Sequence, residues 1–129
     1  MSALTGLTMR RASSVLELAW DDGLSASLSA EFLRVHSPSA EVRGHGPGQA
    51  KLVDAKQDVG FVRMEPVGNY GAKLIFDDGH DSGIYSWVLL RELAEQHDSL
   101  WQRYLEQLAE AGKKRSAGGV KLFSVKTET

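Results

Sequence analysis

Two stretches of the chain repeat one pattern, "WDDGLSASLSAEFLR" at residues 20–34 and "FDDGHDSGIYSWVLLR" at residues 76–91. Each begins with an aromatic residue and Asp-Asp-Gly, continues through a serine, and ends in Leu-Arg. Asp-Gly supplies the positive φ that a tight turn between antiparallel strands needs. The serine, Ser29 or Ser86, precedes an apolar run and can cap the first turn of a helix. Each copy therefore predicts strand, turn, strand and helix, in that order.

The sequence around both copies extends this pattern to most of the chain. Period-two or continuous apolar runs predict strands at residues 14–20, 24–29, 59–66, 71–77 and 81–85. Helices are expected at residues 30–35, 87–96 and 99–111, the last one capped by Asp98 and closed by Gly112. Strands and helices are segregated rather than alternating, which favours an α+β fold. We expect a small antiparallel sheet built from two duplicated strand–turn–strand–helix units, with the C-terminal helices packed on it.

The chain of 129 residues suits one domain with unstructured ends. Residues 1–13 are polar without clear periodicity, so we expect a flexible N-terminus. The domain is predicted to span residues 14–112. Residues 113–129 begin with a basic run and continue rich in glycine and threonine, which is typical of a flexible basic tail.

Composition excludes several classes of function. There is no cysteine, which rules out disulfides, thiol nucleophiles and thiolate metal sites. The formal net charge of −2 gives no general attraction to nucleic acid. No stretch is long and apolar enough to predict a membrane span or a signal peptide, so a cytoplasmic protein is expected.

The long loop at residues 36–51, "HSPSAEVRGHGPGQAK", is the first candidate for a site, because loops of this length are often functional. It contains His36, Arg43 and His45, and His80 follows the second turn. Arg43 offers a fixed fork of donors for a carboxylate or phosphate. The histidines either converge on a metal ion or are turn residues bonded locally. Each Asp-Asp pair precedes a glycine, so a turn accounts for it better than calcium binding or acid–base chemistry.

The combination "W-D-D-G…S…LR-x-x-S-P-S-A-E-V-R-G-H-G" followed by "VGNYGAKLIFDDGHDSGIYSW" resembles the gamma-butyrobetaine hydroxylase N-terminal-like domain. The resemblance covers roughly residues 14–108. In the hydroxylases this domain precedes a separate 2-oxoglutarate-dependent catalytic domain, which this short chain cannot hold. The family also occurs as short stand-alone bacterial proteins, and it is similar to the C-terminal module of a plastid iron–sulfur scaffold ATPase.

The resemblance implies a remnant of a zinc site. The family's cysteine-rich stretch aligns with the residues after the first Leu-Arg, and its histidine aligns with His80. Ser37, Ser39 and Val42 stand where the three cysteines would be. A structural zinc site needs four good ligands, so no metal and no other cofactor is expected here.

Three functions remain open at this stage. The first is a non-catalytic accessory or protein-interaction module, with a possible link to iron–sulfur assembly factors and a binding surface formed by His36, Arg43, His45 and His80. The second is an iron- or zinc-binding protein that uses His36, His45 and His80. The third is a small-ligand binder or enzyme at the 36–51 loop. In the first case the partner is a protein, not nucleic acid or membrane, and the chain is a monomer or a weak homo-oligomer.

Overall fold

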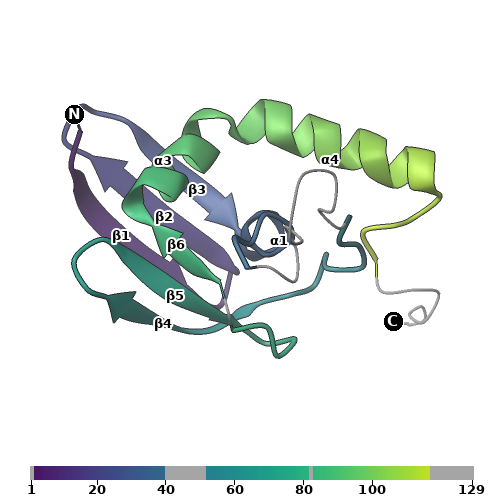
Figure 1. Cartoon of the computed structure of the whole chain (residues 1–129), viewed down its shortest axis with the longest axis horizontal. Helices are drawn as coiled ribbons and strands as arrows, with labels where there is room; N and C mark the ends of the chain where they lie inside the picture. Colours follow the sequence, from purple (N-terminus) through teal and green to yellow (C-terminus); the bar gives the residue numbers. More distant parts are fainter. Residues whose placement is uncertain (1, 40–51, 82, 117–129) are drawn as a thin grey trace.

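The computed structural model describes residues 2–39, 52–81 and 83–116 of the chain. The first unit consists of β1 (Leu4–Arg10), β2 (Val15–Trp20), β3 (Ser25–Ser29) and α1 (Ala30–Val35). The second unit consists of β4 (Phe61–Val67), β5 (Gly71–Phe76), β6 (Ile84–Ser86) and α3 (Trp87–Glu95). The long helix α4 (His97–Ala111) follows directly and extends past α1 (Figure 1).

The strands pair only with neighbours in sequence and form two antiparallel sheets, in the orders β1-β2-β3 and β4-β5-β6. The α+β prediction is confirmed. The expected common sheet is instead two sheets that lie beside each other, where β1 approaches β4 (Figure 1). Arg11, just after β1, donates from Nη1 to the carbonyl of Val62 in β4 at 3.0 Å.

Strand β1 differs from the predicted flexible N-terminus at residues 1–13. Residues 4–10 form a strand that pairs with β2, from Leu4 opposite Trp20 to Arg10 opposite Val15. The register shifts between Leu4 and Gly6, which breaks the period-two pattern that would otherwise identify a strand from sequence. The first unit therefore has three strands before its helix, one more than predicted, and matches the three strands of the second unit.

The two Asp-Asp-Gly turns occupy equivalent places in the two units. The backbone N–H of Gly23 donates to Trp20, and that of Gly79 donates to Phe76, both at 3.2 Å. The φ angles of these glycines are +94° and +91°, values that side-chain-bearing residues rarely adopt. The matching geometry supports the duplication that the sequence predicted.

The first aspartate of each turn fixes the chain that enters the unit. Asp21 Oδ1 accepts a hydrogen bond from the N–H of Ala3, and Asp77 Oδ1 accepts one from the N–H of Gly60, both at 3.0 Å. The backbone N–H groups of the same aspartates donate back to Ala3 and Gly60 at 2.9 Å. These carboxylates are therefore structural groups of the turns.

The predicted serine caps are present. Ser29 Oγ accepts from the N–H of Phe32, and Ser86 Oγ accepts from the N–H of Leu89, both at 3.0 Å. The predicted cap at Asp98 is wrong, because α4 begins at His97 and Asp98 lies in its first turn. There its charge is favourable to the helix dipole without a capping hydrogen bond. Gly112 ends α4 with a φ of +69°.

A single apolar core joins the two units. Both sheets and the helices α1 and α3 contribute to it, through Leu16, Leu18, Trp20, Leu28, Phe32, Leu33, Phe61, Leu74, Phe76, Tyr85, Leu90 and Leu93. A smaller cluster of Val35, Tyr104 and Leu108 holds α4. None of the described helices is long and apolar enough to cross a membrane.

Residues 113–116 are part of the folded domain, which corrects the predicted boundary at residue 112. Arg115 forms a bidentate ion pair with Glu31 of α1, with N···O distances of 2.8 and 3.0 Å. The carbonyls of Lys114 and Arg115 accept from Ala55 and Gln57, both at 2.9 Å. A basic run that was predicted to belong to a flexible tail therefore supplies a contact to a buried carboxylate. Residues 117–129 of the predicted tail lie outside the described residues.

Candidate functional site

Three polar side chains meet in the interior, where the chain after α1 passes the second Asp-Asp-Gly turn. Ser37 Oγ lies 2.8 Å from Nε2 of His80, and Ser39 Oγ lies 3.5 Å from the same nitrogen. The two serine hydroxyls are 3.3 Å apart. Ser37 is fully buried, and only 5% of His80 is exposed. The two hydroxyls and the imidazole therefore form a hydrogen-bonded cluster that is closed to solvent.

A charged cluster borders these residues. Asp78 Oδ2 accepts from Arg34 Nε at 2.9 Å and from Lys56 Nζ at 2.6 Å, and Asp78 Oδ1 accepts from the N–H of His80 at 3.1 Å. Burial alone would raise the pKa of Asp78, but the hydrogen bonds from Lys56, His80 and Arg34 lower it to about 2. The Asp78 carboxylate therefore remains ionised through the whole physiological range.

An equivalent ion pair forms at the turn of the first unit. Asp22 accepts from Nη2 and Nη1 of Arg91 at 2.7 and 3.2 Å, and Arg91 Nε donates to Glu95 at 2.7 Å. Hydrogen bonds from Arg91, the amide of Leu24 and Ser2 hold the pKa of Asp22 well below its ordinary value. Each turn thus binds the arginine at the Leu-Arg position of the other unit's helix. The repeated aspartate and arginine are partners in two exchanged ion pairs.

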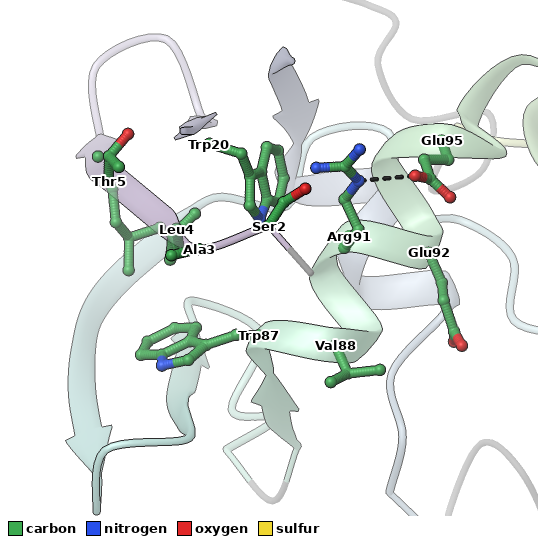
Figure 2. Close-up of a pocket in the computed structure, with 12 residues that line it drawn as sticks. Ser2, Ala3, Leu4, Thr5, Trp20, Trp87, Val88, Arg91, Glu92 and Glu95 are labelled. Carbon is green, nitrogen blue, oxygen red and sulfur yellow. Dashed lines mark hydrogen bonds and ion pairs between the residues drawn. The ribbon is translucent and has the colours of Figure 1, made fainter. Parts of the chain in front are cut away.

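A groove of about 930 Å³ lies between β1 and α3. The N-terminal residues from Ser2 to Leu7 form one wall, and Trp20 lies at its base (Figure 2). The other wall consists of side chains on successive turns of α3, namely Trp87, Val88, Arg91, Glu92 and Glu95. Val88 is 67% exposed, the largest exposure among the big apolar side chains of the described residues.

The groove combines an apolar floor with an acidic rim. The guanidinium of Arg91 stacks over Trp20, with 5.2 Å between its carbon and the ring centroid, and is engaged by Asp22 and Glu95. Glu92 has an exposed side chain and forms no ion pair within the described residues. Sequence analysis missed this groove because one of its walls is the strand that was expected to be flexible.

A family model for the gamma-butyrobetaine hydroxylase-like N-terminal domain matches residues 7–91. The chain belongs to this family. The match includes both repeated stretches in full and confirms the resemblance seen in the sequence. The comparison with curated proteins gives no match.

Three solved structures are similar to this chain. One protein solved by NMR in solution is 49% identical, with a TM-score of 0.79, covering 95% of this chain and 98% of that chain. A second NMR structure is 45% identical, with a TM-score of 0.76 and coverages of 100% and 95%. A crystal structure of a DUF971-family protein of unknown function from Acidithiobacillus ferrooxidans is 35% identical, with a TM-score of 0.59 and coverages of 70% and 91%.

The serine–histidine cluster occupies the place where the resemblance to the gamma-butyrobetaine hydroxylase-like family implies a zinc remnant, and two of its three side chains are serine hydroxyls, which are not among the usual ligands of a structural zinc ion. Ser37 Oγ and His80 Nε2 are 2.8 Å apart and bond each other directly. In residues 2–39, 52–81 and 83–116, no three His, Asp or Glu side chains gather as a metal site. Val42, the third cysteine position, lies outside the described residues.

The structure brings together only part of the binding surface that the sequence predicted for this family member. His80 does approach the start of the 36–51 loop, but it is buried and cannot itself form an exposed surface. His36 is half-buried, with Nδ1 2.9 Å from the carbonyl oxygen of Phe32 and its ring against the Phe32 ring. Arg43 and His45 lie outside the described residues.

The Ser37–His80 pair has the spacing of a nucleophile and its base, yet its setting does not suit catalysis in this domain. A catalytic serine must reach a substrate carbonyl beside donors for the oxyanion. Ser37 is fully buried among Ser39, His80 and Gly83. The hydroxyl therefore bonds the imidazole in the interior and is not exposed to solvent.

Proposed function

We propose that this member of the gamma-butyrobetaine hydroxylase-like N-terminal family is a protein-interaction module without a catalytic centre of its own. The observation that carries the proposal is the groove between β1 and α3, with its exposed Val88 and acidic rim. An exposed apolar side chain in a concave surface rimmed by charge is typical of a site that another protein covers.

The buried polar side chains also support the proposal, because their contacts are structural. The described interior contains Glu31, Arg34, Ser37, Ser39 and His80 as its buried polar residues. Each has a hydrogen bond or ion pair within the domain. Such groups stabilise a fold when their partners are in place. These contacts give each of the five side chains a structural role, which supports the proposal.

The expected link to iron–sulfur assembly factors belongs to this proposal as a class of partner to be tested. A photo-crosslinking amino acid placed at Val88, in the native host, should capture a partner that the same group placed at Glu110 does not capture. Glu110 is a matched control because it is exposed on α4, away from the groove. Mass spectrometry of the adduct identifies the captured protein.

Binding of the purified partner then tests the groove directly. Val88→Asp should weaken the complex at least tenfold, or about 1.4 kcal/mol, because a charge would replace an apolar contact. Glu110→Lys should leave the affinity unchanged. Equal capture from both positions, or unchanged affinity with Val88→Asp, would show that the groove is not the interaction site.

A further inference from the structure

The duplication places a second groove beside α1, equivalent to the open one beside α3. Glu31 and Val88 are both the second residue of a serine-capped helix. Val59 and Ser2 both precede the residue that bonds the first aspartate of a turn. The cavity beside α1 contains Glu31 and Val59, and the groove beside α3 contains Val88 and Ser2. The two cavities therefore lie at equivalent positions of the two units.

The chain itself covers the cavity beside α1. The covering segments, residues 53–59 and 113–116, contain neither helix nor strand and bond each other through backbone groups. Arg115 binds Glu31 through two hydrogen bonds and lies over Trp101, 5.1 Å from the ring centroid. The remaining cavity is about 350 Å³, against about 930 Å³ beside α3. This position therefore accepts an irregular segment that carries a basic side chain.

The open groove beside α3 is larger than the cavity beside α1 and presents different chemical groups. Val88 takes the place of Glu31, so an apolar side chain replaces the carboxylate at the start of the helix. Glu92 follows one helical turn later, about 6 Å along α3. In an extended chain, residues two positions apart lie about 6.6 Å apart and point to the same side. The groove is therefore spaced for an apolar side chain and a basic one, two positions apart.

We infer that the groove beside α3 binds an extended segment of a partner protein in which an apolar residue and a lysine or arginine stand two positions apart. This inference rests on the proposed function and adds the chemistry of the partner. The apolar residue packs on Val88 and Trp87, and the basic residue pairs with Glu92. Arg91 does not repel it, because Asp22 and Glu95 already neutralise that guanidinium.

The test uses the full chain, labelled with ¹⁵N, and a capped heptapeptide of the sequence Ser-Thr-Leu-Thr-Arg-Thr-Ser. An otherwise identical peptide with glutamate in place of arginine is the control. The arginine peptide should shift the NMR signals of the Val88 amide and the Trp87 indole in a saturable manner. Its dissociation constant should be at least tenfold lower than that of the glutamate peptide. Glu92→Lys should reverse this preference, whereas Glu110→Lys should leave it unchanged.

Other outcomes overturn the inference in distinguishable ways. Equal binding of the two peptides, or shifts away from α3, would contradict the proposed chemistry. If neither peptide binds while Val88 crosslinks a partner, the apolar–basic motif is wrong and the proposed function stands. If removal of residues 117–129 alone shifts the Trp87 and Val88 signals, the occupant is the chain's own C-terminal segment rather than a partner.

Discussion

Replacing the second aspartate of each turn by asparagine should affect the two equivalent ion pairs very differently. Arg34 is buried, with 7% of its side chain exposed, and Asp78 is 19% exposed. Removing the partner of a buried charge typically costs about 3–5 kcal/mol. Asp78 and its second partner, Lys56, are both partly exposed, so water can compensate for part of the lost interaction. Asp78→Asn should therefore cost about 3 kcal/mol. The Asp22–Arg91 pair is more exposed, at 37% and 24%, so Asp22→Asn should cost less.

The pH dependence gives this prediction a second, independent readout. The folded pKa of Asp78 is about 2, below its ordinary value of about 3.9 in an unfolded chain. A lowered carboxylate pKa stabilises the fold above the unfolded value, and that stability is lost as pH falls toward the folded pKa. The difference in unfolding free energy between wild type and Asp78→Asn should therefore be constant from pH 7 to 5 and shrink below pH 4.

Urea unfolding followed by tryptophan fluorescence at several pH values between 7 and 3 measures both effects. Arg34→Met combined with Asp78→Asn should recover part of the loss, because the buried positive charge is then gone as well. Equal costs for Asp22→Asn and Asp78→Asn, or a difference independent of pH, would refute the buried ion pair as a source of stability.

Three further changes probe the domain boundary, the core and the serine–histidine cluster. A chain ending at Gly112 should melt roughly 5–10 °C below one ending at Ser116, since it leaves the buried Glu31 without Arg115; equal melting temperatures would restore the boundary at residue 112. Leu90→Ala should cost about 3 kcal/mol and the exposed Val88→Ala almost nothing, as measured by chemical denaturation. Protein purified without a tag should contain well under one equivalent of zinc or iron by elemental analysis, and stoichiometric metal lost with His80→Ala would favour the metal-binding alternative.

The sequence predicts those parts of the fold that local chemistry determines. Asp-Gly turns and serine caps each depend on residues within one or two turns of each other, and all were found. The duplication was also visible, because its aromatic, turn, cap and Leu-Arg positions recur in order. Strand β1 was missed because the register shift near Gly6 and its half-exposed faces leave no clear alternation.

Contacts between distant segments could not be predicted in the same way. The basic run "KKR" has the composition of a solvated helix end, and nothing near Arg115 in the sequence indicates a carboxylate 84 residues away. The approach of Ser37 to His80 spans 43 residues. It was expected only through the resemblance to a family, not from spacing. The groove beside α3 could not be predicted either. It forms where β1, whose sequence shows no clear alternation, meets one face of α3.

The two ion pairs explain why the aspartate and the arginine both recur, although they lie at opposite ends of the repeated pattern. The first aspartate of each turn holds the entering chain of its own unit, while the second binds the arginine of the other unit's helix. A change in one unit is therefore constrained by the other. The side chain after the turn glycine takes part in neither of these contacts, and it differs between the units. Leu24 packs against the core, whereas His80 bonds a cluster of buried hydroxyls. The cavity beside α1 is covered by irregular segments of the same chain, whereas the groove beside α3 is open among the described residues.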